Sequence, residues 1–321
     1  MKFFVDFFTL YFIVIKNVNH KVKGKNMNDI IKDVLEKKAV LSKLLKNKDN
    51  RDVLYAWLKT ELAYTSNAIE GNTLSRHETT MAIEENITSG SKPISHYVEA
   101  VNHARAFDLV MDMARKKNVI NVANVLQIHK CILSGIDDAN AGCFRRVPVR
   151  ISGSRTVLPN PLKVPDLMEQ FNRWITTTNA DAVDVALDAH YRLVTIHPFK
   201  DGNGRTARLL MNLLLMQSGF IPVVIRKIDR KRYLDVLEKY QTTGNGEAYK
   251  NFMLNALNRS LKMAIDMLDV NAPDVNKLVT ISEYAKAKGV PVSTIRYWVQ
   301  IGRVKPVAYT DAGYMLFNPK K

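Results

Sequence analysis

Apolar residues recur along most of the chain with helical spacing. From Asn28 onward, large aliphatic side chains return every three or four positions, as on the buried face of an amphipathic helix. The predicted helices span residues 28–45, 53–65, 78–85, 96–115, 122–133, 164–176, 184–196, 205–217, 233–240 and 248–268. The pattern therefore predicts a mainly α-helical fold.

Two stretches alternate between apolar and polar residues instead. Residues 147–158 alternate around a polar, glycine-containing centre, which predicts a β-hairpin. Residues 304–317 alternate in the same way around a turn at 311–313. They follow two short predicted helices, 281–289 and 294–301, and this order is typical of a winged helix-turn-helix.

The length of 321 residues allows more than one domain. We expect N-terminal helices in residues 27–95, a helical core in 96–270, a proline-containing linker in 271–276 and a small C-terminal module in 277–321.

Residues 3–15 are apolar except for Asp6. This run is too short for an ordinary membrane span. Lys2 precedes it, as in a signal peptide, but no cleavage site of small residues follows. We expect residues 1–26 to be unstructured or an upstream extension of the reading frame, because Met27 begins a well-patterned helix.

Composition narrows the class of protein. Apolar residues make up 46% and aromatic residues 8%, which is typical of a globular chain. The net charge of +16 suits nucleic acid or nucleotide as a partner, although lysine-rich surfaces are also common. Cys131 and Cys143 lack metal-ligand spacing, so we expect reduced thiols in a cytoplasmic protein.

The strongest chemical signal lies between His197 and Arg208. Gly202 and Gly204 bracket a turn before a predicted helix, where unpaired N–H groups and the helix dipole attract anions. Arg205 and Arg208 lie three residues apart and can bind phosphate oxygens from one side. The segment predicts a phosphate-binding site.

Two further groups in this segment suit phosphate transfer. Asp201 offers a carboxylate oxygen for Mg²⁺, and His197 can be a neutral base near pH 7. The alternative is an ordinary loop-to-helix junction with a core histidine. That alternative explains each residue singly, but not their concentration within one short segment.

The segment reads His197-Pro-Phe-Lys-Asp-Gly-Asn-Gly-Arg-Thr-Ala-Arg208. It resembles the Fic family signature, His-x-Phe-x-(Asp/Glu)-Gly-Asn-Gly-Arg-x-x-Arg, at every specified position. The resemblance implies a helical Fic core that transfers AMP from ATP to a protein hydroxyl, with His197 as the base and Mg²⁺ on Asp201. The related Doc kinases alter the glycine-rich part, so the resemblance favours AMP transfer over phosphorylation.

The resemblance also implies a set of nucleotide-binding residues. They are Gly202, Asn203, Gly204, Arg205, Thr206, Ala207, Arg208 and Tyr233. Tyr233 is placed near the adenine by this resemblance, and an ordinary core tyrosine is the open alternative.

An upstream motif, Ser66-x-x-x-Glu70-Gly71, would alone be a helix end with a surface carboxylate. Beside the signature it resembles the family's inhibitory motif, (Ser/Thr)-x-x-x-Glu-(Gly/Asn). The resemblance implies that Glu70 pairs with Arg208 and keeps ATP from a productive pose. Because breaking a buried ion pair leaves a charge uncompensated, we expect release to involve movement of the whole helix.

A third element, Gly142-Cys-Phe-Arg145, resembles the family's Gly-x-(Phe/Tyr)-Arg sequence that leads to a hairpin flap. By this resemblance the hairpin holds the target segment by strand addition, and an isolated surface hairpin is the alternative. The flap residues are Val149, Arg150, Ile151, Ser152, Gly153 and Ser154.

Residues 277–321 resemble the small winged helix-turn-helix of the MerR or excisionase type. Arg296, Arg303 and Lys305 are candidate phosphate contacts on DNA, with Thr294 and Tyr297 near base edges. Docking to another protein stays open as the alternative.

We therefore expect autoinhibited AMPylation of a Ser, Thr or Tyr hydroxyl, using ATP and Mg²⁺ and releasing pyrophosphate. The acceptor is another protein or the chain itself, a homodimer is possible, and no membrane partner is expected. Two alternatives remain: the same site removes AMP, or the chain is a DNA-binding regulator whose Fic domain senses nucleotide.

Overall fold

The computed structural model describes residues 26–88, 92–268, 278–304, 306, 308–309 and 315–319. The chain divides into two compact units, Met1–Ile265 and Asp266–Lys321. The predictions for residues 1–25, for the linker 271–276, for the turn at 311–313 and for Lys305 lie outside the described residues.

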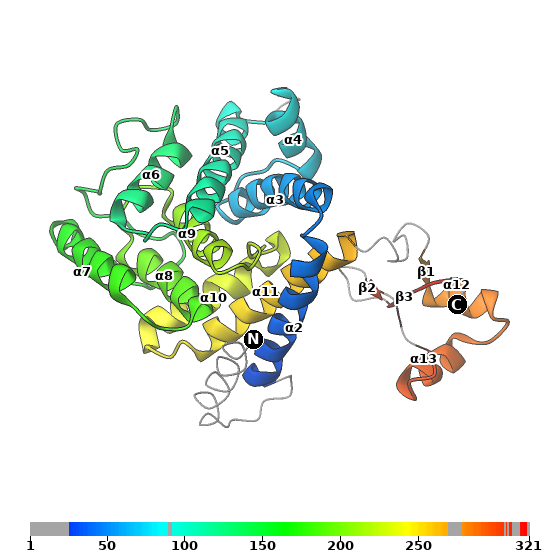
Figure 1. Ribbon diagram of the computed structural model, residues 1–321. Helices are drawn as coiled ribbons and strands as arrows, with labels where there is room; N and C mark the ends of the chain where they lie inside the picture. Colours follow the sequence, from blue (N-terminus) through cyan, green and yellow to red (C-terminus); the bar gives the residue numbers. More distant parts are fainter. Residues whose placement is uncertain are drawn as a thin grey trace. The chain divides into compact units, whose positions relative to one another are not determined.

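The first unit is helical (Figure 1). Its helices are α2 Met27–Leu44, α3 Lys48–Ile69, α4 Arg76–Thr80, α5 Ile94–Lys116, α6 Val122–Leu133, α7 Val164–Thr177, α8 Ala182–Ile196, α9 Asn203–Gln217, α10 Arg230–Thr243 and α11 Glu247–Leu268. Short turns are the π-helical η1 Met81–Glu85 and the 3₁₀ segments η2 Pro161–Lys163 and η3 Lys227–Asp229. The predicted mainly α-helical fold is confirmed.

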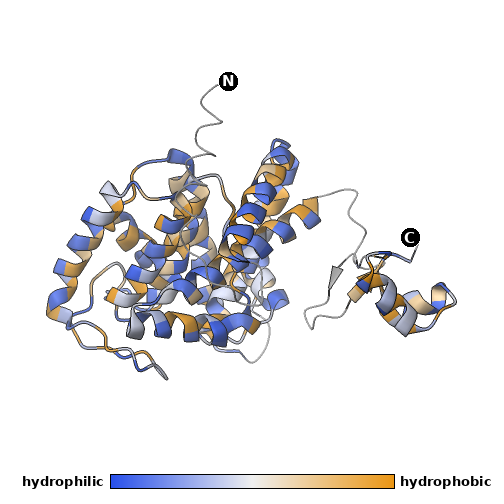
Figure 2. Ribbon diagram, turned by 90° about the horizontal axis from the view of Figure 1, so that it is seen from below, coloured by the Kyte–Doolittle hydropathy of each residue, from blue (hydrophilic) through white to orange (hydrophobic). Residues whose placement is uncertain are grey.

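Helix α9 is central to this unit. It packs against α3, α5, α6 and α8 (Figure 1), and its side chains are buried almost without interruption. After its polar first turns, α9 continues with apolar residues on all sides from Leu209 to Leu215 except Asn212, and such a stretch is stable only in a protein core. Most of the surrounding helices carry both polar and apolar residues (Figure 2). The first turn of α9 is therefore held in a fixed position by its neighbours.

The predicted hairpin at residues 147–158 is only partly confirmed. A turn is present, with Gly153 at φ 75° and the Ser154 N–H donating to the Ile151 carbonyl (3.2 Å). The flanking residues form no strands, so that part of the prediction is wrong. A lone two-stranded ribbon is marginal in water, and here α10 supplies acceptors instead: Glu238 accepts the Arg155 N–H at 2.6 Å.

The second unit consists of β1 Val279–Thr280, α12 Ile281–Ala287, α13 Val292–Gln300, β2 Ala308–Tyr309 and β3 Met315–Phe317. The strands form an antiparallel sheet of order β1-β3-β2, with Val279 opposite Phe317. Tyr284 stacks on Phe317 at 4.8 Å between ring centres, and Ile295 is buried beside them. The predicted helix pair and strand-forming wing are confirmed, and β1 is an addition.

Among the described residues, no helix has both the length and the apolar composition needed to cross a membrane. Cys131 and Cys143 are free thiols.

Three histidines in the first unit are buried as neutral groups. Burial is the main cause that lowers the pKa of His103 and His190 to about 3, and that of His129 to about 4. In the unfolded chain the histidine pKa values are near 6.5. Below that pH the unfolded chain therefore binds protons that the folded chain does not bind. Their stabilising contribution is complete above pH 6.5 and is lost as the pH falls toward 4.

We expect the free energy of unfolding to fall between pH 6.5 and 5 by about 1.4 kcal/mol per pH unit for each such histidine. Urea unfolding followed by circular dichroism at both pH values measures this change. His190→Gln should reduce this fall in the free energy of unfolding by the contribution of about one histidine. An identical dependence in this variant would contradict the assignment.

Candidate active site

The turn between α8 and α9 is closed by side chains within it. His197 ends α8 in the left-handed conformation (φ 51°), and Gly202 precedes α9 at φ 76°. Asn203 bridges the turn, because its amide donates to the Phe199 carbonyl and accepts the Phe199 N–H, both at 2.9 Å. The predicted phosphate ligand Asn203 thus uses its side chain to fix the backbone of the turn.

His129 of α6 packs against this turn and forms a hydrogen bond with it. Its Nε2 donates to the Asp201 carbonyl (3.0 Å), and its Nδ1 accepts the Gly142 N–H (2.9 Å). The ring stacks on Phe199 with 3.6 Å between centres. Both nitrogens are therefore engaged, and His129 positions the turn as a neutral group.

Arg145 fixes the unusual backbone at His197. Its Nε donates to the His197 carbonyl at 2.7 Å, and its own N–H donates to the Pro198 carbonyl at 2.8 Å. The same guanidinium donates to the carbonyls of Val147 and Pro159, at the two ends of the predicted flap. One buried side chain thus joins His197 to the flap. The sequence revealed Arg145 only as part of a family element.

The imidazole of His197 is oriented as a base. Nδ1 lies 3.2 Å from the Val194 carbonyl and must carry the proton, since a carbonyl only accepts. Nε2 is therefore free to accept. Burial lowers the pKa of His197 and prevails over the opposing effects of that hydrogen bond and of the Glu70 and Asp201 carboxylates. The ring is neutral near pH 7.

The first turn of α9 forms a cradle of N–H groups. The first intrahelical bond runs from the Thr206 N–H to the Gly202 carbonyl (2.9 Å), so the preceding N–H groups of residues 203–205 have no acceptor within the helix. The helix dipole adds positive potential at this end. Gly204 has no room for a side chain, because a Cβ would contact the Glu70 carboxylate and lie 2.9 Å from Arg208 Nη1.

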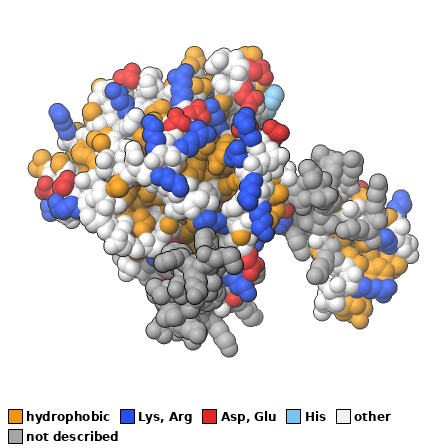
Figure 3. Space-filling view, viewed as in Figure 1, with side chains coloured by type: hydrophobic (Ala, Val, Ile, Leu, Met, Phe, Trp, Pro, Cys, Tyr) orange, Lys and Arg blue, Asp and Glu red, His pale blue; other side chains and the backbone are white. Residues whose placement is uncertain are grey.

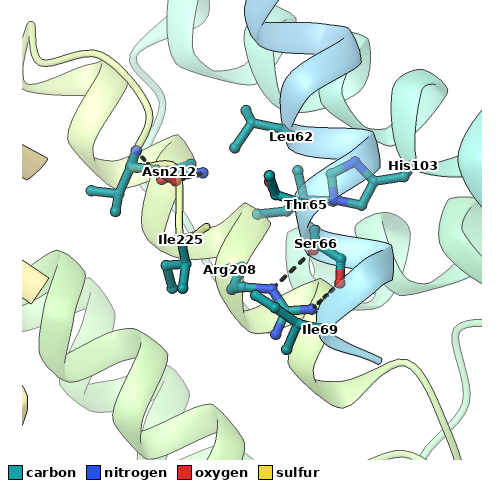
Figure 4. Close-up of a pocket in the computed structure, with 10 residues that line it drawn as sticks. Leu62, Thr65, Ser66, Ile69, His103, Arg208, Asn212 and Ile225 are labelled. Carbon is teal, nitrogen blue, oxygen red and sulfur yellow. Dashed lines mark hydrogen bonds between the residues drawn. The ribbon is translucent and has the colours of Figure 1, made fainter. Parts of the chain in front are cut away.

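Arg208 is 5% exposed and is held by the end of α3. Its Nη2 pairs with Glu70 Oε1 at 2.6 Å. Its Nε donates to the Ser66 hydroxyl at 2.9 Å, and Nη2 also donates to the Ser66 carbonyl at 3.0 Å (Figure 4). Glu70 follows the last residue of α3, and Gly71 leaves the helix at φ 101°. The predicted contact between Glu70 and Arg208 is present.

Arg205 is held by a second set of carboxylates. Nη1 pairs with Glu99 of α5 and Nη2 with Asp201, both at 3.0 Å. The other Glu99 oxygen accepts from the amide of Asn72 at 2.8 Å. The segment that follows α3 is therefore connected to Arg205 as well. Neither Glu99 nor Asn72 stood out in the sequence, because neither belongs to a recognisable motif.

Asp201 fits a divalent cation that also binds phosphate. Its side chain is 67% exposed, and its oxygens bind only the Gly202 N–H and Arg205. No cluster of three or more histidine, cysteine or acidic side chains suited to a metal occurs among the described residues. A single exposed carboxylate beside an anion site is the arrangement that Mg²⁺ uses with phosphate oxygens.

Three of the predicted nucleotide ligands have their side chains in the core. Thr206 and Ala207 face inward from α9. Tyr233 is 1% exposed, and its hydroxyl lies 2.8 Å from His190 Nε2. The ring of Tyr233 is thus buried behind Arg208, as in the core-tyrosine alternative, and its contact with adenine stays a prediction.

A small cavity lies on the α3 side of Arg208. It measures about 10 Å³ and is lined by Leu62, Thr65, His103 and Asn212 among others (Figure 4). Such a volume holds one water molecule. Both ring nitrogens of His103 lack a hydrogen-bond partner among the described residues. The cavity is far too small for a nucleotide.

The contact between Gly204 and Glu70 predicts non-additive stability. Gly204→Ala should lower the free energy of unfolding more in the native protein than in the Glu70→Gly variant, because the added methyl displaces the Glu70 carboxylate. We expect a coupling energy of about 1 kcal/mol in a double-mutant cycle measured by urea unfolding. Gly202→Ala is the control, since its Cβ would contact Leu133 and His129 but not Glu70. Additive effects of Gly204→Ala and Glu70→Gly would contradict the contact.

Comparison with known sequences matches residues 119–215 to the Fic/DOC family and residues 280–317 to the MerR family of regulatory proteins. The protein adenylyltransferase Fic of Aedes aegypti is 36% identical over 204 residues, 62% of this chain and 40% of that protein. The Drosophila melanogaster protein of the same name is 34% identical over 203 residues, 62% of this chain and 41% of its own. The chain thus spans about two fifths of the length of these curated relatives.

Solved structures agree with this match. Fic-1 of C. elegans (residues 134–508) aligns with a TM-score of 0.66 and 26% identity, covering 74% of this chain and 71% of that one. A Fic domain containing signaling protein from Bacteroides thetaiotaomicron aligns with a TM-score of 0.65 and 26% identity, covering 74% and 96%. Residues 119–215, which include the signature turn, its cradle and both arginines, thus match the Fic/DOC family.

Proposed function

We propose that this chain transfers AMP from ATP to a Ser, Thr or Tyr hydroxyl of a protein and releases pyrophosphate. The observation that carries the proposal is the free Nε2 of His197 at the edge of an N–H cradle flanked by two arginines. The names of the curated relatives, protein adenylyltransferase Fic, support it.

The triphosphate binds in the first turn of α9. Backbone N–H groups of residues 203–205 and the helix dipole attract the phosphates. Arg205 and Arg208 add positive charge that is already oriented, because Glu99 holds Arg205 and the buried Ser66 holds Arg208. Asp201 would hold Mg²⁺, which neutralises phosphate charge when it is bound.

His197 removes the proton of the acceptor hydroxyl. As Nε2 accepts this proton, the hydroxyl oxygen attacks the α-phosphorus, a new P–O bond forms, and the bond to the β-phosphate oxygen breaks. General-base assistance contributes about 10²- to 10⁴-fold to such a step. Positioning by the cradle and stabilisation of the developing charge supply the rest.

The segment 147–158 positions the target. Its backbone has no strand partner in the described chain, and Val157 is 93% exposed. An extended target peptide can therefore add to residues 149–154 through backbone hydrogen bonds. Arg145 sets the distance between this segment and His197 through the carbonyls of His197 and Pro159.

Glu70 restrains the activity. Its carboxylate covers Gly204 and occupies one N–H direction of Arg208 that a terminal phosphate would need. Like charges at this spot disfavour the phosphate further. ATP then binds in a pose unsuited to attack until Glu70 withdraws.

The same position of Glu70 supports a second candidate activity, hydrolysis of the AMP ester. A carboxylate that is 39% exposed beside the cradle can orient a water molecule toward the α-phosphorus. Incubating AMP-modified target protein with the chain and measuring released AMP tests this reaction. Release that survives Glu70→Gln would remove the carboxylate from that role.

The match of residues 280–317 to the MerR family supports DNA as a further partner. Tyr297 of α13 is exposed, and Arg303 lies over the Trp298 ring at 4.7 Å. On the face shown in Figure 3, basic side chains are scattered among acidic and apolar ones. Sequence-specific DNA binding together with normal behaviour of His197→Ala in cells would favour a nucleotide-sensing regulator over an enzyme.

Glu70→Gly should raise labelling of protein by ATP carrying radioactive α-phosphate. Without Glu70, one N–H of Arg208 becomes available to a phosphate oxygen. We expect this charged hydrogen bond to raise the labelling rate by about 10-fold or more. Glu70→Gln keeps the size of the side chain but not its charge. Its labelling rate should therefore lie between those of Glu70→Gly and the native protein. His197→Ala in the Glu70→Gly background is the control and should abolish labelling. Unchanged labelling in Glu70→Gly would remove the inhibitory role.

The pH dependence of labelling follows from His197. The base works in its neutral form, so activity is complete above its pKa and is lost as the pH falls through it. Burial puts that pKa below 6.5. For Glu70→Gly we expect a plateau in kcat/KM down to about pH 6.5 and a loss approaching tenfold per pH unit below the pKa. An acid limb centred above pH 7 would contradict this assignment.

A further inference from the structure

A chain of buried hydrogen bonds runs behind Arg208, and the proposed reaction does not use it directly. His190 of α8 lies between two tyrosines, with Nε2 2.8 Å from the Tyr233 hydroxyl and Nδ1 2.8 Å from the Tyr249 hydroxyl. Tyr249 in turn donates to the Leu187 carbonyl at 2.9 Å. All three side chains are buried. Tyr233 faces the guanidinium of Arg208 at the other end.

One backbone carbonyl fixes the direction of every bond in this chain. A carbonyl only accepts, so the Tyr249 hydroxyl donates its proton to the Leu187 carbonyl. Its oxygen must therefore accept a hydrogen bond from His190 Nδ1. A neutral imidazole has one N–H, so Nε2 of His190 is an acceptor and takes the proton of Tyr233. The Tyr233 oxygen then has only lone pairs left. These lone pairs are available to the neighbouring Arg208 guanidinium, which only donates.

We call the hydrogen-bonded side chains of Tyr249, His190 and Tyr233 the relay. The directions of its hydrogen bonds do not change with pH near neutrality. Burial and the charge of Arg208 lower the pKa of His190 to about 3. The ring is therefore neutral whenever the chain is folded at ordinary pH. Tyr233 always presents an acceptor to Arg208 and never a proton.

This acceptor matters most when Glu70 has withdrawn. Arg208 binds Ser66 through Nε and Nη2, and it binds Glu70 through Nη2. Without Glu70, the side chain keeps Ser66 on one side and Tyr233 on the other. The two remaining acceptors hold the guanidinium where it lies, with the N–H direction vacated by Glu70 open toward the cradle.

We propose that His190 is a positioning residue that acts through Tyr233 to keep Arg208 aimed at the terminal phosphates of the nucleotide. The proposal rests on the proposed function and deepens it. His190 and His197 belong to one structural element, since His197 directly follows the last residue of α8. The same helix thus places the base and orients the arginine that binds the leaving phosphates.

The test uses the full chain with Glu70→Gly as the parent. Binding of an ATP analogue that cannot be transferred, with a methylene between the α- and β-phosphorus atoms, is measured by calorimetry with Mg²⁺. His190→Leu and Tyr233→Phe should each raise Kd by about 10-fold or more, since a hydrogen bond to a charged group is worth that much. His190→Gln, whose amide can accept from Tyr233 and donate to Tyr249, should restore binding to within about threefold of the parent.

A purely structural role predicts a different result, and Phe252→Leu serves as the matched control. Phe252 packs on Tyr233 with 6.0 Å between ring centres but lies outside the hydrogen-bond chain. It should lower the melting temperature as the relay variants do and leave Kd unchanged. Equal Kd values for His190→Leu, Tyr233→Phe and the parent would overturn the proposal. So would a Kd for His190→Gln as weak as that for His190→Leu.

The position of Arg208 separates this proposal from the proposed function. A crystal structure of the Glu70→Gly/His190→Leu variant should show the guanidinium displaced from Ser66 Oγ. An undisplaced guanidinium would refute the relay even if the parent binds and transfers AMP. If the parent fails to bind nucleotide, the proposed function fails, and the displacement still decides whether His190 positions Arg208.

Discussion

The structure depends on how one buried cation is neutralised. Arg208 lies within α9, whose side chains are almost all buried, and a guanidinium that has lost water needs hydrogen-bond acceptors. Those acceptors come from separate parts of the first unit: the end of α3 supplies Ser66 and Glu70, and α10 supplies Tyr233. Because these acceptors lie on different segments, a single charge connects α3, α9 and α10.

Arg205 repeats this arrangement one turn earlier. Glu99 accepts from Arg205 with one oxygen and from Asn72 with the other, while its backbone carbonyl accepts from Asn67. The end of α3 and the turn after it are therefore connected to both arginines of the cradle, directly to Arg208 and through Glu99 to Arg205. The proposed restraint by Glu70 and the geometry of the phosphate site belong to one continuous polar network, which is why a change at α3 can alter nucleotide binding.

Local patterns in the sequence were sufficient for the helices and for the anion-binding turn before α9. The Glu70–Arg208 contact was predicted only from the resemblance to the Fic family. Helical spacing locates α6 from Val122 to Leu133 because its apolar face repeats regularly. The prediction of strands at 147–158 was wrong because alternation of apolar and polar residues reflects which side chains are exposed. A strand also needs a neighbouring strand for its backbone hydrogen bonds. The role of Tyr233 near the adenine stays a prediction, because a tyrosine at helical spacing has the same sequence pattern in a base pocket and in a core. Only three-dimensional contacts identify His190, Glu99 and the anchoring by Arg145.

The end of α3 shows how restraint by Glu70 can be released. The sequence suggested movement of the whole helix, but Leu58, Leu62 and Ile69 are buried along α3, and exposing each would cost about 1.5–3 kcal/mol. Glu70 itself lies beyond the last helical residue, is 39% exposed and is followed by Gly71 in the left-handed conformation. Rotating this side chain toward solvent leaves Ser66 and Tyr233 in place on Arg208. A local movement of the Glu70–Gly71 junction therefore opens the cradle at far lower cost than displacement of α3.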